Sequence, residues 1–136
     1  MSMTLNERNP NVSTIPIGTN ASGVTIVVPG IYFRKHSRIK NVWFLDQVGI
    51  ALSSSDYQTI KLQDNSSSPV TYASVATSAA AAVVNTPLAL AYTNSSDSTN
   101  NLELDVPAGT QLNVSLVGTG HAIVTKAIML IEWYPV

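Results

Sequence analysis

Hydrophobic and polar residues alternate along most of this chain with a period of two, the spacing of a half-buried β-strand. The longest such segment is the last, residues 122–136. Its second face is apolar at its centre, at Ile128 and Leu130, although Lys126 and Glu132 flank them. A strand with one solvated face would not favour such residues, so we expect this strand to lie centrally in a sheet or beneath another subunit. Its first face carries Ile123, Thr125, Ala127, Met129, Ile131 and Trp133.

Shorter segments of the same kind precede it. In residues 38–45, Ile39, Trp43 and Leu45 share one face, and Val42 and Phe44 share the other. Pro16 interrupts the first segment and indicates a short edge strand, because proline cannot donate a hydrogen bond to a sheet. The sequence predicts strands at 12–17, 24–28, 38–45, 57–62, 87–92, 102–106 and 111–117.

The connections are rich in Gly, Pro, Asn and Ser, which favour turns. Turns or loops are predicted at 19–23, 29–30, 53–55, 64–69, 93–101 and 118–121. Residues 74–84 are ambiguous, since their alanines would suit a helical turn. Their flanking Thr and Val residues and the following Pro87 favour a strand or an extended loop. We expect the extended form there, with the helical turn left as the alternative.

These elements indicate the fold class. Seven to nine short strands in a chain of this length are typical of an all-β protein, an antiparallel β-sandwich that is jelly-roll-like. A length of 136 residues suits one domain. Residues 1–12 are polar and include Pro10, so we expect an irregular N-terminal arm over 1–12 and a single β-sandwich domain over 13–136.

Composition narrows the possible partners. The formal net charge is −1, so no broad positive field exists to attract nucleic acid. The absence of cysteine excludes disulfides and thiolate metal sites and fits assembly in a reducing cytoplasm. Neither a signal peptide nor a long apolar run occurs, so we expect a soluble protein without a membrane partner.

The sequence offers little catalytic chemistry. His36 and His121 are the only histidines, and no nucleophile elbow, zinc-binding helix motif or phosphate loop is found. We expect no enzyme activity, no cofactor and no metal site.

Candidate contact residues come from charge and from the last strand. Residues 34–40 contain four of the seven lysines and arginines. They could meet an anionic partner, or form a solvated connection whose charge discourages pairing of sheet edges. Trp43 and Trp133 are expected in the core, with exposed sugar-binding positions as the alternative. The candidate partner-binding residues are Arg34, Lys35, Arg38, Lys40, Ile128, Leu130 and Tyr134.

The layout of these segments resembles the capsid decoration (cement) proteins of tailed bacteriophages and related small virion β-sandwich proteins. The resemblance covers residues 24–136 and is carried by the strands at 38–45 and 57–62, the small-residue run to residue 90, the turn and strand at 106–112 and the final aliphatic strand. No residue of that family is carried over singly, because the family has no fixed motif.

The resemblance implies a structural virion protein on the capsid exterior, assembled in the host cytoplasm. Its partners would be the major capsid protein and copies of itself, with a trimer as the expected homo-oligomer. It would stabilise the lattice by clamping neighbouring major capsid subunits. The alternative is a carbohydrate- or receptor-binding virion module, such as a head fibre or a tail tip.

Overall fold

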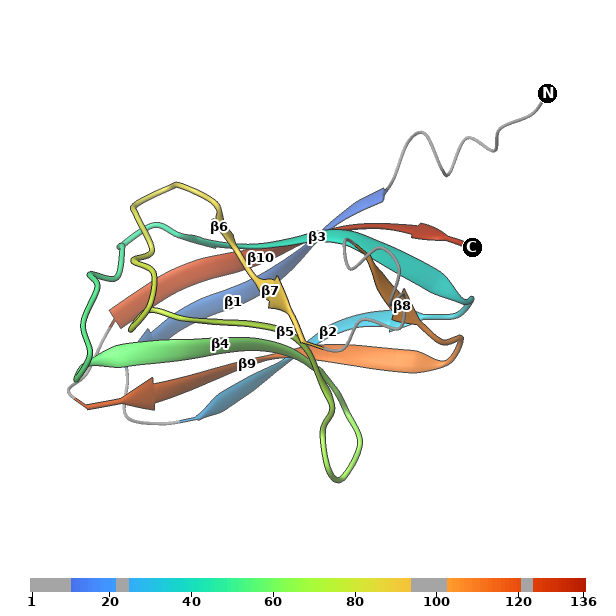
Figure 1. The fold of residues 1–136 in the computed structure, drawn as a ribbon, viewed down its shortest axis with the longest axis horizontal. Helices are drawn as coiled ribbons and strands as arrows, with labels where there is room; N and C mark the ends of the chain where they lie inside the picture. Colours follow the sequence, from blue (N-terminus) through green and yellow to red (C-terminus); the bar gives the residue numbers. More distant parts are fainter. Residues whose placement is uncertain (1–10, 22–24, 94–102, 121–123) are drawn as a thin grey trace.

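Two antiparallel sheets packed face to face make up this computed structural model, which describes residues 11–21, 25–93, 103–120 and 124–136 (Figure 1). No helix occurs in these ranges. The strands are β1 (Asn11–Ala21), β2 (Ile26–Phe33), β3 (Ser37–Asp46), β4 (Tyr57–Asp64), β5 (Thr71–Ala76), β6 (Leu88–Ala89), β7 (Ala91–Tyr92), β8 (Leu104–Val106), β9 (Thr110–Thr119) and β10 (Val124–Pro135).

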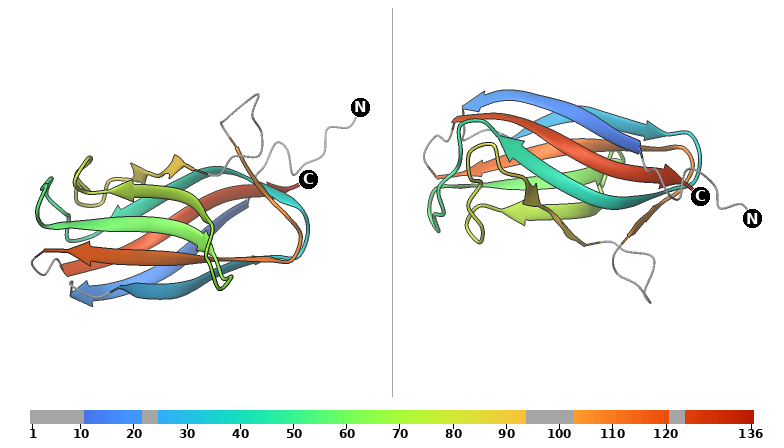
Figure 2. Two further views of the ribbon diagram at one scale, coloured as in Figure 1. Left: turned by 60° about the horizontal axis from the view of Figure 1, so that its bottom comes forward. Right: turned by 90° about the horizontal axis from the view of Figure 1, so that it is seen from above.

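The order of strands is that of a jelly roll. One sheet runs β1-β10-β3-β6, with β8 pairing with β3 beside β6, and the other runs β2-β9-β4-β5-β7. Strands from the start of the chain therefore pair with strands from its end in both sheets, β1 with β10 and β2 with β9. Figure 2 shows the two layers from the side. The predicted antiparallel, jelly-roll-like β-sandwich is confirmed.

The last strand takes the central position predicted for it. β10 pairs with β1 on one edge and with β3 on the other. Its inward residues are buried between the sheets, while Ile128 and Leu130 are half-buried on the outer face.

The core lies between the two sheets and follows the period-two pattern. In β4 the buried residues are Gln58, Ile60 and Leu62, as the alternation predicts. The largest fully buried apolar side chains are Phe33, Phe44, Ile39, Ile60, Leu62, Leu104, Leu112, Leu116, Met129 and Ile131.

The first strand is longer than predicted. β1 begins at Asn11, within the predicted arm, and continues to Ala21, within the predicted turn. Pairing along most of β10 supplies the backbone hydrogen bonds that extend it. Pro16 lies on this edge strand as expected, and the register shifts between Pro16 and Gly18. Residues 1–10 of the predicted arm lie outside the described residues.

The predicted faces of β3 were wrong beyond Ile39. Trp43 and Leu45 lie on the outer face, whereas Val42 and Phe44 are buried. The cause is a bulge, since the pairing of β3 with β10 shifts between Glu132 and Trp133. One extra residue in β3 turns every later side chain to the other face.

The segment predicted as one strand at 87–92 is divided between the sheets. β6 pairs with β3, whereas β7 pairs with β5 in the opposite sheet. Leu90 lies between them, is buried, and donates its backbone N–H to the carbonyl of Val42 at 3.0 Å. This crossing closes one side of the sandwich (Figure 1).

The ambiguous stretch at 74–84 is extended or turned, without a helix, as expected. The predicted break at 29–30 is a bulge inside a continuous β2. The predicted hairpin at 118–121 begins later, because Gly118 and Thr119 still belong to β9. His121 lies outside the described residues.

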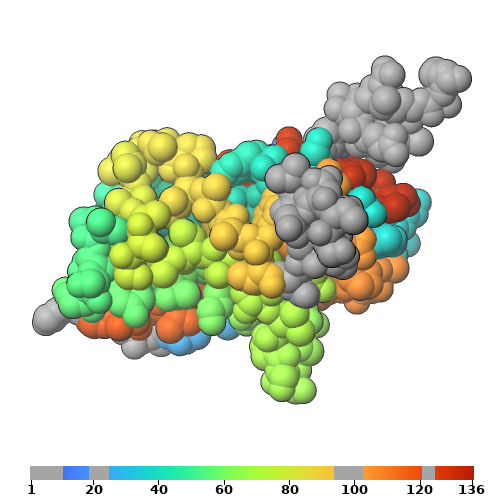
Figure 3. All heavy atoms as spheres, viewed as in Figure 1, coloured from blue at the N-terminus to red at the C-terminus, as the bar shows by residue number. Residues whose placement is uncertain are grey.

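The predicted turn at 64–69 joins β4 to β5 and projects from the body of the molecule (Figure 3). Asp64 organises it, because one carboxylate oxygen accepts hydrogen bonds from the backbone N–H of Val70 at 2.9 Å and from the hydroxyl of Ser66 at 2.8 Å. Burial alone would raise the pKa of Asp64, but these hydrogen bonds outweigh it and lower the pKa.

Candidate interaction surfaces

The predicted basic segment is divided by its ion pairs. Nε2 of His36 lies within hydrogen-bonding distance of Oδ1 of Asp105, and the Arg38 guanidinium lies 3.8 Å from Asp105 and 3.9 Å from Glu103. Both acids flank β8 or belong to it, so these contacts join β8 to the start of β3. Arg38 is thus engaged by acids of the same chain.

Tyr134 belongs to the same network. Its hydroxyl donates a hydrogen bond to Oε2 of Glu103 at 2.7 Å. Burial raises the pKa of Tyr134, and the hydrogen bond and charge of Glu103 raise it further. This side chain links the end of β10 to the chain just before β8.

Lys40 lies at the bulge of β3, where its carbonyl accepts a hydrogen bond from the hydroxyl of Tyr92. Its side chain is half-exposed. The structure therefore does not gather the four predicted cations at one site.

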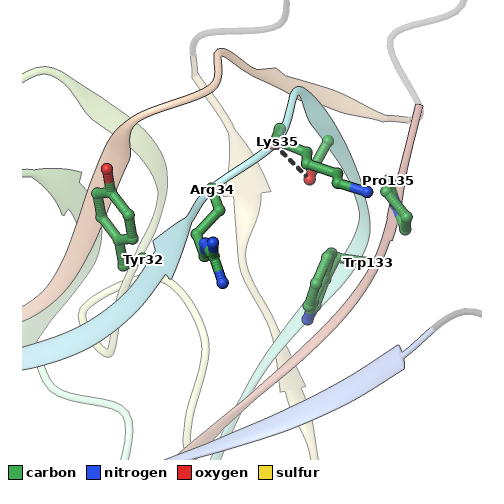
Figure 4. A pocket seen from close by; sticks show the side chains of 6 residues that line it. Tyr32, Arg34, Lys35, Trp133 and Pro135 are labelled. Carbon is green, nitrogen blue, oxygen red and sulfur yellow. Dashed lines mark hydrogen bonds between the residues drawn. The ribbon is translucent and has the colours of Figure 1, made fainter.

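Arg34 and Lys35 line a cavity of about 420 Å³ between the end of β2, the start of β3 and the end of β10. Both are exposed, and neither has an ion pair among the described residues. The remaining lining comes from Tyr32, Ser37, Trp133 and Pro135. In Figure 4 the Arg34 side chain lies between the rings of Tyr32 and Trp133.

The aromatic wall of this cavity is fixed by its neighbours. Trp133 donates its indole N–H to the Ser13 hydroxyl at 2.9 Å. Its ring meets Phe33 edge to face, with centroids 5.1 Å apart. Trp133 is only partly buried against the core, so it combines a packing role with one accessible side. The sequence favoured a core position and did not connect this ring with Arg34.

A second surface crosses the outer face of the first sheet. Cross-strand partners Pro16, Ile128 and Leu45 form one row, and Thr14, Leu130, Trp43 and Ala89 form the next. We call Pro16, Trp43, Leu45, Ile128 and Leu130 the outer apolar band. At one end of it a hollow of about 220 Å³ is bordered by Pro16, Leu45, Ile128 and Lys126. Ile128 and Leu130 were predicted here, whereas Trp43 and Leu45 were missed because the bulge was not foreseen.

A third surface lies at the end of the molecule opposite the cavity. The β3–β4 connection and the segment after β5 are joined there by two backbone hydrogen bonds between Ile50 and Ala82. Figure 1 places these loops far from the C-terminus. Their exposed side chains Val48, Leu52, Val83 and Val84 are called the apolar loop cluster. Composition alone gave no signal for it, because the polar residues between them obscure the grouping.

The described ranges also bear on metal binding and on membrane insertion. They contain no group of three His, Cys, Asp or Glu side chains arranged to hold a metal ion. Nor do they contain a helix long and apolar enough to cross a bilayer.

Comparison with known proteins found no match to a protein family, to a curated protein or to a solved structure.

Proposed function

We propose that this chain is a structural virion protein that binds the outer surface of a phage capsid and clamps neighbouring major capsid subunits. The observation that supports it best is the outer apolar band on the central strand β10. A clamp needs contact surfaces rather than reactive groups, and it needs more than one of them. The jelly roll and the resemblance in strand layout add support, although jelly rolls serve many functions.

The outer apolar band is the surface for a second copy of the chain. A solvated sheet face normally carries polar residues, whereas this one presents Trp43, Leu45, Ile128 and Leu130 side by side. Lys126 and Glu132 lie on the same face of β10 at either end of the apolar pair, so ionic contacts can set the register of the neighbour. The homo-oligomer we propose is the expected trimer.

The apolar loop cluster is the surface for the major capsid protein. Val83 is 61% exposed and Leu52 is 60% exposed, on loops tied to each other by backbone hydrogen bonds. An oligomer would repeat this cluster once per subunit, so several weak contacts would act together.

The test uses capsids assembled from the major capsid protein of the same genome and expanded in vitro. We expect the purified protein to co-sediment with expanded capsids and to raise their melting temperature. The double variant Val83→Asp and Val84→Asp should lose co-sedimentation while remaining folded. Thr86→Asp, on the same exposed segment, is the matched control and should retain it. Wild-type protein that ignores expanded capsids would exclude the proposal.

The second candidate function is a carbohydrate- or receptor-binding virion module. The cavity beside Trp133 favours it, because an accessible aromatic ring and two cations converge there. A glycan array with the intact protein tests it, and the absence of any signal across a broad array would count against it.

A further inference from the structure

The cavity at the end of β10 carries a local excess of positive charge. Arg34 and Lys35 have no ion pair among the described residues, whereas the nearby acids Glu103 and Asp105 already contact Arg38 or His36. The chain as a whole is slightly acidic, with a net charge of −1. The cavity therefore carries two adjacent cations without ion pairs among the described residues, which can attract an anion.

The two cations differ in what they offer. The guanidinium of Arg34 is a planar fork that matches both oxygens of a carboxylate, and the Lys35 ammonium adds a mobile point charge. Ser37 contributes little hydrogen bonding, because it is buried and its hydroxyl donates to the Lys35 carbonyl at 2.9 Å.

Beside these cations the cavity has flat, apolar walls. The rings of Tyr32, Trp133 and Pro135 line it, and Tyr32 is 57% exposed. The Trp133 indole N–H is already used by Ser13, so this ring offers its surface rather than a hydrogen bond. Ring surfaces of this kind pack against the C–H face of a sugar. A volume of about 420 Å³ is suited to one or two sugar rings.

Two of the three strands that border the cavity offer no edge to a peptide. β3 is paired on both sides where it borders the cavity, since Ser37 pairs with Pro135 and with Val106. β10 is also paired on both sides, since Trp133 pairs with Asn11 and with Ile39. Neither of these strands has a free edge to which an extended peptide could add. β2, which carries Tyr32, is an edge strand paired with β9 alone in its sheet, so the experiment includes a peptide ligand as a comparison.

We propose that this cavity binds a saccharide that carries a carboxylate, with Arg34 and Lys35 holding the carboxylate and Trp133, Tyr32 and Pro135 packing against the sugar ring. The inference rests on the second candidate function, whose ligand class it names, and it does not depend on the capsid clamp. The cavity and the apolar loop cluster lie at opposite ends of the ten-residue strand β3, about 30 Å apart. A copy attached by its loops would thus keep the cavity free.

The experiment follows the two tryptophan indole N–H signals by NMR in ¹⁵N-labelled full-length protein. Glucuronic acid is added in one series, and glucose, acetate and a blocked glutamate dipeptide are added in three others. We expect glucuronic acid to shift the Trp133 signal in a saturable way and to leave the Trp43 signal, on the outer apolar band, unchanged. Glucose should bind at least about tenfold more weakly, because it lacks the charged hydrogen bonds.

Variants assign the effect to the cavity. Arg34→Ala with Lys35→Ala should weaken glucuronic acid binding by at least about tenfold. Lys61→Ala, in β4, removes a positive charge elsewhere and should leave glucuronic acid binding unchanged. An unaltered pattern of core amide signals verifies that each variant is folded. If a double variant does not fold, the two single substitutions are tested in its place.

Three results would overturn the inference. Equal binding of glucose and glucuronic acid would leave a neutral sugar site, so the second candidate function would survive without the carboxylate. Acetate or the glutamate dipeptide binding as tightly as glucuronic acid would show that the sugar ring contributes nothing. No shift with any ligand would remove the site altogether, while capsid co-sedimentation would still report separately on the clamp.

Discussion

Several buried polar side chains make the interior of this sandwich less uniform than its apolar core suggests. Gln58 has no exposed surface, and neither its amide oxygen nor its amide nitrogen has a hydrogen-bond partner among the described residues. Asp46 is better satisfied by hydrogen bonds, because one of its carboxylate oxygens accepts a hydrogen bond from the backbone N–H of Lys126 at 2.9 Å and another from that of Val48 at 3.3 Å. Buried polar groups without partners lower stability, so Gln58 is the weaker of the two positions.

Replacing Gln58 with Leu should therefore stabilise the protein. The side chain volume is nearly kept while an unpaired amide is removed, so we expect a gain of about 1 kcal/mol in the free energy of unfolding. Chemical denaturation measures it. Gln63→Leu, on the same strand but half-exposed, is the matched control and should change stability by less than about 0.5 kcal/mol. A loss of stability in Gln58→Leu would mean that the amide is paired.

The raised pKa of Tyr92 leads us to expect a loss of stability at alkaline pH. Burial raises its pKa to about 12, and the carboxylates of Glu103 and Glu132 add to the shift. The pKa of an ordinary tyrosine, as in the unfolded chain, is 10.0, so between pH 10 and about 12 the unfolded chain binds fewer protons than the folded chain. The contribution of the Tyr92 proton to the free energy of unfolding is thus complete below pH 10 and decreases as the pH rises from 10 to about 12.

Denaturation curves at about pH 9 and about pH 11.5 measure this effect. Tyr92→Phe should lose less stability between the two pH values than the wild type does, because it has no proton to release. Tyr32→Phe, at an exposed ring, should follow the wild type. Equal losses in wild type and Tyr92→Phe would contradict the assignment.

Among the elements, β2 shows how one glycine permits a bulge. The register of β2 on β9 shifts between Pro29 and Ile31, so Gly30 has no partner of its own in β9. Its backbone N–H instead points to the Asn113 side chain, 3.4 Å from the amide oxygen. A Cβ at Gly30 would lie 2.3 Å from the carbonyl oxygen of Leu112, in the backbone of the neighbouring strand. Only a residue without a side chain fits there.

Gly30→Ala should consequently destabilise the protein by roughly 2 kcal/mol or more, because the paired backbone of β9 cannot move away cheaply. Thermal unfolding followed by circular dichroism measures the change. Gly18→Ala is the matched control at the bulge of β1, where φ is +78° but no atom lies within 4 Å of the added Cβ. It should cost only backbone strain, about 1 kcal/mol. A smaller cost at Gly30 than at Gly18 would refute the steric explanation.

At the scale of the whole molecule, the three candidate surfaces lie on different parts of the sandwich. The outer apolar band lies along the side of the sandwich, the apolar loop cluster at one end, and the cationic cavity at the other. One protomer can thus contact copies of itself with its side while both ends remain available. This separation allows the proposed clamp and the proposed saccharide site to exist in the same assembly.

Substitutions in the outer apolar band should weaken oligomerisation. Ile128→Thr with Leu130→Thr keeps residues that favour strands but removes apolar contact surface, so we expect the oligomer to dissociate to monomer in sedimentation velocity runs. Val83→Thr with Val84→Thr, on the apolar loop cluster, should leave the oligomer intact. A wild-type chain that is already monomeric at high concentration would contradict the role given to the band.

The sequence by itself determined most of the strands, the sandwich and the inward face of β4 and of most of β10, because a period of two depends only on local alternation. It did not predict β5 as a separate strand. It also indicated that the last strand lies centrally in a sheet or beneath another subunit, and the structure confirms the central position. Residues 34–40 were recognised as the main cluster of positive charge. These features lie within single segments, so no knowledge of the pairing is needed to find them.

Only the tertiary structure decided which of these residues share a surface. The bulge in β3 depends on its pairing with β10, and it turned Trp43 and Leu45 outward. Asp105 and Glu103 engage Arg38 from beyond a long connection, which leaves Arg34 and Lys35 beside Trp133. Register and ion pairing between distant segments are properties of the folded chain, since the local pattern of either segment is compatible with several partners.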